Sequence, residues 1–500
     1  MAAILRLFHL GHQSLWIDEM FTWLSSGGGG PLTLRDVLED VHGPLYSAAV
    51  HVATRLGGAT EWALRLPSAI AGVLTVPAFA WLAARWLDRR AVAPAAWLAA
   101  CSPFLVWYSQ EARNYAWLML GTCVSGAALL ELQRHCDARN VARYFAAAVA
   151  ALLSNLSFLL LAPLHLRWWL AGEPSTRRAR IAWLAGVTVA IALIALPWLP
   201  QVARTWDWRR LQPEHAAAAD ETPLRGATTF HAAAMPFALH AFAVGYTLGP
   251  SLRELRAHAG GGTLRRHAGE LLATGLTFGV LGVLGLWSLA RRRRLAETAL
   301  WLVAPGLVVS YFALHNFKVF HPRYLIVSLP CFLLVVTAAF TDAPARLRWL
   351  LGAAVAALWG VSLAQHYFVP EYGREDYRGA LAIVRAGFSP GEQVMAAGAE
   401  EPVEFYARGM RVEPFWLGFT TRPGRLEQKL QETFARAHGT WVVLSRAEDL
   451  DPEDRFASRL DASVPPSGRW SRPGVRVWHV AAGRENAENA AGVRRSTGAP

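Results

Sequence analysis

The chain has 500 residues, of which 53% are hydrophobic, and its mean hydropathy is positive at +0.23. Its formal net charge of +12 would suit a nucleic-acid-binding protein. The arginines, however, cluster at the ends of apolar segments, as in Arg291–Arg294, which is the positive-inside pattern of membrane proteins. The four scattered cysteines form neither a metal-binding motif nor a disulfide framework. Composition therefore excludes a nucleic-acid-binding or disulfide-rich class and predicts a membrane protein.

Apolar stretches along most of the chain predict a polytopic α-helical membrane protein, because about 20 apolar residues suffice to span a bilayer. The candidate spans are 64–86, 91–108, 114–133, 141–154, 156–171, 181–200, 271–290, 297–315, 322–340 and 346–368. Segments 44–59 and 229–249 carry histidines within short apolar stretches, and we expect neither to cross the membrane. Residues 13–63 then form one long external loop.

The fall in apolar density after the last span and the alternation of basic loops together predict three regions. A multi-span membrane domain covers residues 1–368, an external α/β domain covers 369–483, and 484–500 is a disordered tail. Within the α/β domain we expect helices at 375–386 and 426–437 and strands at 393–398, 440–445 and 475–481. The stretch before residue 13 is too short to span a membrane, and we expect the natural start to lie upstream.

The external loops contain the candidate catalytic and binding residues. Asp18 and Glu19 are adjacent carboxylates among bulky apolar residues, close to the membrane, where acidic side chains favour a functional role. The alternative is that Asp18 caps a short surface helix. Further polar and aromatic candidates in the external loops are Asp40, His42, Tyr46, Arg65, Gln110, Glu111, Arg113, Tyr115, Lys318, Arg323 and Tyr324.

Carboxylates and fixed cations on one side of a membrane suit displacement of a phosphate leaving group. A carboxylate deprotonates the attacking hydroxyl, and arginine or lysine stabilises the departing phosphate. Structural alternatives remain for these candidates: Arg113 pairs with Glu111, Lys318 and Arg323 anchor a helix end, and Tyr115 belongs to an aromatic belt.

The sequence predicts no metal site and no cofactor. Asp40 and His42 offer two ligands to a divalent cation, but a hydrogen-bonded structural pair is the favoured interpretation. No glycine-rich stretch opens a phosphate-binding helix in a βα unit, so a nucleotide site is not indicated either.

Five motifs occur in an order that resembles the bacterial family 39 glycosyltransferases, relatives of the protein O-mannosyltransferases and lipid A aminoarabinose transferases. The motifs are SLWIDE, DVHGPLY, ALRLPSAIAGVL, SPFLVWYSQEARNYAW and HPRYLIVSLP, within residues 12–410. The resemblance implies the GT-C fold, with many membrane helices, a catalytic first external loop and a C-terminal external domain. It also implies transfer of a sugar from a polyprenyl-phosphate carrier, with inversion.

Carried over by position, the resemblance places the family's catalytic acidic residue on Asp18 and the second acidic residue of that motif on Glu19. The family's Gln-Glu-Ala-Arg motif falls on 110–113 and its Arg-Tyr-Leu motif on 323–325. His-Pro-Pro-Leu of the family is similar to residues 42–45, where Gly43 replaces a proline.

We therefore expect an inverting glycosyltransferase of the cytoplasmic membrane, with its active site on the outer face. Its partners would be a polyprenyl-phosphate-linked sugar donor, a lipid, glycan or protein acceptor, and membrane lipid. The sequence leaves open a lipid-linked sugar flippase or transporter, and a noncatalytic envelope-assembly protein. A flippase would more often show inverted repeats and broken helices at mid-membrane, and charges here concentrate in loops instead.

Overall fold

The computed structural model describes residues 1–40, 43–171, 176–205, 233–257, 261–315, 320–415, 423–436, 438–451 and 453–481. His42, Lys318 and the tail 484–500 lie outside these residues. The chain divides into two compact units, which are described separately. The first comprises Met1–Gly11, Phe21–Pro250 and Leu264–Tyr367, and the second comprises His12–Met20, Ser251–Thr263 and Phe368–Pro500.

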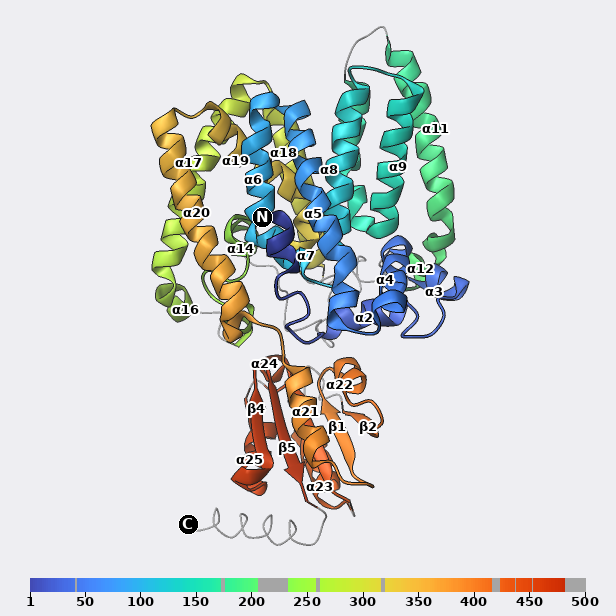
Figure 1. Cartoon of the computed structure of the whole chain (residues 1–500), viewed down its shortest axis with the longest axis vertical. Helices are drawn as coiled ribbons and strands as arrows, with labels where there is room; N and C mark the ends of the chain where they lie inside the picture. The colour runs from blue at the N-terminus through green and yellow to red at the C-terminus, as the bar shows by residue number, and fades with distance from the viewer. Residues whose placement is uncertain are drawn as a thin grey trace. The chain divides into compact units, whose positions relative to one another are not determined.

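The first unit is an assembly of helices, labelled in Figure 1. It contains α1 (Ala2–Leu7), α3 (Leu34–Glu39), α4 (Pro44–Gly57), α5 (Glu61–Trp86), η1 (Arg89–Ala91), α6 (Val92–Cys101), α7 (Pro103–Ser109), α8 (Tyr115–Leu132), α9 (Ala138–Ser154), η2 (Leu156–Leu161), α10 (Ala162–Leu170), α11 (Arg177–Ala195), η4 (Leu196–Trp198), α12 (Leu199–Thr205), α14 (Ala234–Val244), α17 (Ala268–Arg291), α18 (Leu295–Leu314), η7 (Pro322–Ser328), α19 (Leu329–Asp342) and α20 (Ala345–Phe368). Helix α2 (Ile17–Ser25) begins in the second unit and continues into the first, and α16 (Gly261–Arg266) likewise contains the boundary at residue 263.

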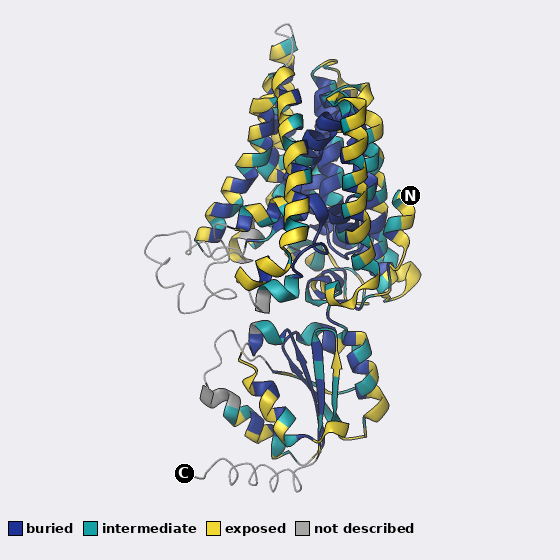
Figure 2. Cartoon of the chain, turned by 90° about the vertical axis from the view of Figure 1, so that its left-hand side faces the viewer, coloured by how far each residue is buried: buried dark blue, intermediate teal, exposed yellow. Residues whose placement is uncertain are grey.

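Seven helices of the described residues are long and apolar enough to cross a membrane, or eight if a bent pair counts as one span. Only 6% of the apolar window in α11 is buried inside the protein. Figure 2 shows exposed residues along the length of several of these helices. Apolar helices with such exposed faces require a lipid environment, so the protein is a multi-pass membrane protein.

Three of the ten predicted spans differ from the prediction. The span at 91–108 is bent by 55° between its two helices, because Pro103 lacks an N–H and disfavours helical geometry at Ser102. The span at 141–154 lies within the longer α9, whose 17 residues are still at the short end for a helix that crosses a membrane. The span at 156–171 begins with the 3-10 turns of η2 before the short α10.

The basic loops are tied together by ion pairs at one end of the first unit. The Arg292 guanidinium lies 3.0 Å from the carboxylates of both Asp88 and Asp342. Arg90 adds a further pair to Asp88 at 3.1 Å. The loops after α5, α17 and α19 therefore meet at the same end of the helices, as the alternation of basic loops predicts.

The second unit is built around a five-stranded sheet with the order β2-β1-β3-β5-β4. Strand β1 is parallel to β2 and β3, whereas β5 is antiparallel to β3 and β4. Its elements after the membrane helices are η8 (Pro370–Tyr372), α21 (Tyr377–Gly387), β1 (Gln393–Ala397), α22 (Glu400–Tyr406), β2 (Val412–Phe415), α23 (Pro423–Phe434), β3 (Thr440–Ser445), α24 (Ala447–Leu450), α25 (Arg455–Ser463), η9 (Pro466–Gly468), β4 (Arg469–Arg472) and β5 (Val475–Val480). The earlier segment Ser251–Thr263 adds α15 (Leu252–Ala257).

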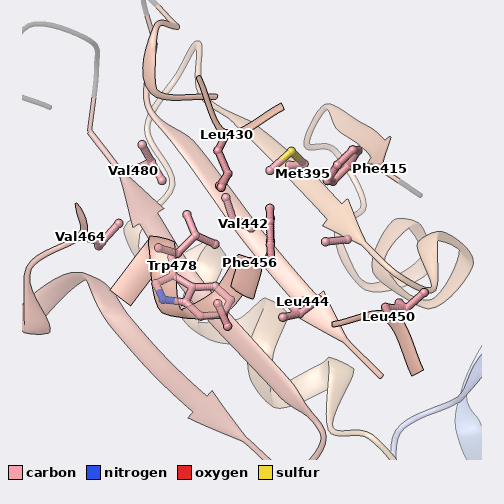
Figure 3. Packing of buried hydrophobic residues seen from close by; sticks show 13 residues of the cluster. Met395, Phe415, Leu430, Val442, Leu444, Leu450, Phe456, Val464, Trp478 and Val480 are labelled. Atoms are coloured by element: carbon pink, nitrogen blue, oxygen red, sulfur yellow. The ribbon is translucent and has the colours of Figure 1, made fainter. Parts of the chain in front are cut away.

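Alternate residues of each strand point to opposite sides of the sheet, and on both sides they are buried under helices. Met395 and Val442 belong to one apolar cluster, with α23 and α25, which is shown in Figure 3. Val394 and Val443 belong to the cluster on the other face, with α21 and α22. The predicted small α/β region is confirmed.

Sequence reasoning missed two strands and three α-helices of the chain after residue 369: β2, β4, α22, α24 and α25. Strand β2 has only four residues and contains Pro414, which is tolerated because β2 is an edge strand. Strand β4 is short, polar and at the opposite edge. Short polar edge strands carry little of the hydrophobic alternation that identifies a strand in a sequence.

Candidate functional site

Asp18 and Glu19 lie in the first turn of α2, which begins at Ile17. The backbone N–H groups of Glu19 and Met20 both donate to the Trp16 carbonyl, at 2.9 and 3.1 Å. The helix thus starts one residue before Asp18, so that side chain is inside the helix rather than at its cap. Adjacent helical residues point about 100° apart, so the two carboxylates face different directions.

Within the first unit, the loop 110–114 joins α7 to α8 and is held by its own polar side chains. The Gln110 amide nitrogen donates to the carbonyls of Arg6 and Phe8, at 3.2 and 2.6 Å. The Gln110 amide oxygen lies 2.8 Å from the His366 ring nitrogen. Gln110 thereby satisfies carbonyls at the end of α1 and ties the loop to α20. Glu111, the next residue, is buried.

Arg113 is positioned through both its backbone and its side chain. The Ser68 hydroxyl donates to the Arg113 carbonyl at 2.9 Å, and the Tyr46 hydroxyl lies 2.8 Å from that of Ser68. The Arg113 guanidinium donates to the Thr22 hydroxyl at 3.3 Å. Tyr46 and Ser68 are both buried. Helices α4 and α5 together therefore fix the backbone from which this cation projects.

The structure brings the motif at 107–115 together with the motif at 321–325. The Arg323 guanidinium carbon lies 5.9 Å from the centre of the Tyr115 ring and 5.3 Å from that of Tyr324. The His321 ring accepts a hydrogen bond from the Arg323 N–H at 3.2 Å and so caps η7. A guanidinium that lies over aromatic faces is held in place by the attraction between its charge and the rings.

A tyrosine pair lies beside this arginine. The Tyr108 and Tyr246 hydroxyls are 2.8 Å apart, and the Tyr108 ring packs edge-on against Tyr115 at 5.1 Å. Burial raises the pKa of the Tyr246 hydroxyl, so this group is neutral at physiological pH. Tyr108 and Tyr246 therefore place uncharged hydroxyl groups, which can form hydrogen bonds, next to the Arg323 cation.

The remaining candidates of the first unit have structural partners. The Ser47 hydroxyl donates to the carboxylate of Asp40, just after α3. Arg65 is buried and donates to the Leu10 carbonyl at 3.0 Å. Among the described residues, no group of three or more histidine, cysteine, aspartate or glutamate side chains is arranged to hold a metal ion.

Several residues that organise this site were not singled out from the sequence. Ser68 lies within the motif ALRLPSAIAGVL, but a buried serine in an apolar helix gives no sign of its partner. Tyr246 is 138 residues from Tyr108 in the sequence, and Thr22 is 91 residues from Arg113. Such long-range partners leave no local pattern.

The chain is a polytopic membrane protein with the GT-C fold. Residues 41–199 match the model of the dolichyl-phosphate-mannose-protein mannosyltransferase family. A search of curated proteins by sequence finds no match. The resemblance to GT-C glycosyltransferases that the motifs predict is confirmed by that family match and by solved structures with this fold.

Two of the similar solved structures are of ArnT from Cupriavidus metallidurans. The apo form is 14% identical with a TM-score of 0.59, and the form bound to undecaprenyl phosphate is 16% identical with a TM-score of 0.56. Each alignment covers 96% of both chains. Archaeal oligosaccharyltransferase AglB from Archaeoglobus fulgidus, in complex with an inhibitory peptide and a dolichol-phosphate, is 12% identical with a TM-score of 0.54. That alignment covers 96% of this chain and 73% of AglB.

Proposed function

We propose that this protein is an inverting glycosyltransferase that moves a sugar from a polyprenyl-phosphate carrier to an acceptor hydroxyl. The observation that carries the proposal is the meeting of Arg323 with Tyr115, which joins two motifs more than two hundred residues apart in the sequence. Solved structures with this fold have undecaprenyl phosphate or dolichol-phosphate bound, which supports a lipid-linked phosphate as the ligand.

In the proposed reaction, Asp18 accepts the proton of the acceptor hydroxyl. The freed oxygen attacks the anomeric carbon of the sugar from the side opposite to the carrier phosphate. The bond between the anomeric carbon and the phosphate oxygen breaks, and its electron pair leaves on the carrier phosphate. One direct displacement inverts the anomeric centre. The reaction needs no acid for the leaving group, because the phosphate departs as an anion.

Arg113, Arg323 and Lys318 are proposed to stabilise the carrier phosphate. Arginine suits this role because its planar fork presents two donors to two phosphate oxygens. Donors already fixed before the reaction lower the barrier more than mobile ones, because they need no reorganisation when charge develops. The contacts of Arg113 to Thr22 and of Arg323 to Tyr115 supply this fixation.

We place the active site on the outer face of the cytoplasmic membrane, by the alternation of basic loops. The basic loops with Asp88 and Arg292 meet at one end of the first unit, which is the proposed cytoplasmic end. Residues after 368 and the loop 110–114 are proposed to face outward.

The decisive experiment is sugar transfer by the purified protein from a panel of synthetic polyprenyl-phosphate sugars to lipid, glycan and peptide acceptors. Transfer with inversion, read by NMR of the product, would support the proposal. A flippase would instead move labelled donor across a vesicle bilayer without consuming it. Donor movement without product from any member of the panel would overturn the enzymatic assignment.

A further inference from the structure

The segment that leads into Asp18 belongs to the second unit, together with the C-terminal α/β region. Its first contacts come from the connection between α20 and α21 and from the first turn of α21. The Ser14 hydroxyl donates to the Glu375 carbonyl at 2.8 Å, and the Arg374 N–H donates to the Gln13 side-chain oxygen at 3.3 Å. Arg378 donates to the carbonyl of His12. Three consecutive residues near the chain's start are thus bound by residues some 360 positions later.

The next three residues of the segment continue the same pattern. The Leu15 N–H donates to the Tyr406 hydroxyl at 2.8 Å. The Trp16 ring lies under the Arg374 guanidinium at 4.9 Å, and Ile17 packs against the apolar cluster that contains Tyr377. Every residue from 12 to 17 therefore has a contact with the C-terminal region.

The last residue of this contacting segment, Ile17, is also the first residue of α2. The Trp16 carbonyl accepts the first hydrogen bonds of helix α2, and Leu15 is the residue immediately before Trp16. The direction in which the first turn projects Asp18 is consequently set by how residues 15 and 16 are held. Tyr406 is itself fixed, because Arg385 donates to its carbonyl at 2.8 Å and its ring packs in the apolar cluster.

We infer that the C-terminal α/β region is a positioning element of the active site and that Tyr406 is a positioning residue for Asp18, through its hydrogen bond to the Leu15 backbone. This inference rests on the proposed function. A general base must be within hydrogen-bond reach of the proton it takes, and a displacement of about 1 Å costs on the order of a hundredfold in rate. A region without a contact to substrate thereby contributes to the rate.

The test is Tyr406→Phe in the full-length protein, which removes one hydroxyl and keeps the ring. Its matched control is Thr433→Val, which removes a buried hydroxyl elsewhere in the same region, where Thr433 donates to the Lys429 carbonyl at 2.8 Å. For Tyr406→Phe we expect kcat to fall about threefold to tenfold, the range for loss of one hydrogen bond, with the KM for the lipid donor unchanged. Thr433→Val should keep the wild-type kcat at a comparable thermal midpoint.

Hydrogen exchange supplies a readout that does not need activity. In Tyr406→Phe the amides of residues 15–20 should exchange faster than in the wild type, and in Thr433→Val they should not. Faster exchange with an unchanged kcat would overturn the positioning role, and so would unchanged exchange. If neither the wild type nor any variant transfers sugar from any donor, the proposed function fails, whereas the exchange result still reports on the contact.

Discussion

The Arg323 guanidinium lies over the Tyr115 ring, 5.9 Å from its centre, and this contact links the start of η7 to the start of α8. Neither residue has a local reason to be near the other, since each follows a different membrane span. Because α8 continues from the loop that carries Arg113, the contact also fixes one end of that loop. Holding a cation in one place before binding lowers the entropic cost of a contact between that cation and an anionic ligand.

The first prediction concerns Arg323. If it holds the carrier phosphate, Arg323→Ala should weaken the charge-assisted contact by about 1.5–3 kcal/mol, or roughly tenfold to a hundredfold in kcat/KM. Arg323→Lys should recover only part of the loss, because lysine lacks the planar fork. The measurement is transfer from a polyprenyl-phosphate sugar, together with donor binding.

A matched control is Arg291→Ala. The Arg291 guanidinium also lies over an aromatic ring, that of Trp287 at 4.8 Å, but in the proposed cytoplasmic loop. This variant removes the same kind of contact and should retain transfer. Equal losses in both variants would indicate that Arg323 stabilises the fold rather than the phosphate.

The second prediction concerns Gly43, where the family pattern has a proline. Gly43 has φ +123°, and an added Cβ would lie 2.1 Å from the Ser154 carbonyl oxygen. Gly43→Ala should therefore destabilise the protein by more than the ~1–3 kcal/mol of an unfavourable backbone conformation. Gly43→Pro should be at least as damaging, since proline requires φ near −65°. The thermal midpoint in detergent measures both.

Gly58 separates the two causes of that loss. It has φ +74° and nothing within 4 Å of an added Cβ, so Gly58→Ala carries the backbone cost alone. A Gly43→Ala variant no less stable than Gly58→Ala would show that the close approach to Ser154 is unimportant.

The Gly43 example shows what the sequence predicted and what it did not. Segment 44–59 was singled out from the sequence as one that does not cross the membrane, and the structure places α4 there, beginning at Pro44. The reason for glycine is the carbonyl of Ser154, more than a hundred residues away, and no local pattern reveals it. The same holds for Arg113, whose carbonyl accepts from Ser68 of α5, 45 residues earlier in the chain.

The membrane helices were predictable for a different reason. Hydrophobic length is a local property, so α5, α17 and α20 were located from their own residues. Length and hydrophobicity did not reveal the 55° bend at Ser102–Pro103, because they carry no information on the direction of the helix axis. The attachment of residues 12–17 to the C-terminal region had no sequence signal, because it joins the two ends of the chain.

The third prediction is a pH dependence of the C-terminal region. Partial burial alone would raise the pKa of Glu413, but Lys429 and Arg436 outweigh it and lower that pKa. A carboxyl with a lower pKa when folded stabilises the fold above its unfolded pKa, and the stabilisation is lost as pH falls through the folded value. We therefore expect this region to unfold at lower urea concentration below about pH 4. Oxidation of Met395, buried in β1, reports that unfolding in the full-length protein.

Two variants test whether ionisation of a given glutamate stabilises or destabilises the folded C-terminal region. Glu413→Gln should be less stable than the wild type at pH 7, with the difference shrinking toward pH 4. Glu401 is the contrast, because burial, with Glu400 and Glu404 nearby, raises its pKa. Its ionisation disfavours folding, so Glu401→Gln should be as stable as the wild type or more stable at pH 7. The same pH response in both variants would contradict this assignment.

The fourth prediction is topological. In a background without the four native cysteines, a cysteine at Ala296, beside the basic loop, should be protected from a membrane-impermeant thiol reagent in intact cells. A cysteine at Ala462, exposed in α25, should react. Permeabilised cells, in which both sites should react, are the control. Reaction at 296 in intact cells would reverse the proposed orientation and move the active site to the cytoplasmic face.

The last prediction is that Asp18, and not Glu19, is the general base. The two carboxylates share the first turn of α2, and their side chains project about 100° apart, so only one faces a given hydroxyl. The resemblance selects Asp18. Asp18→Asn keeps the shape of the side chain and removes its basicity, and transfer should fall on the order of a hundredfold to ten-thousandfold. Donor binding should persist, since the proposed phosphate contacts come from Arg113, Lys318 and Arg323 and not from Asp18.

Glu19→Gln is the matched control for that experiment, because it removes the adjacent charge from the same helical turn. Its loss of transfer should be much smaller, and both variants should keep the wild-type thermal midpoint. The wild-type rate should fall at low pH, where the general base becomes protonated, and the rate of Asp18→Asn should not show this fall. A folded Asp18→Asn protein with near-normal turnover, or a Glu19→Gln protein with the larger loss, would assign the base elsewhere.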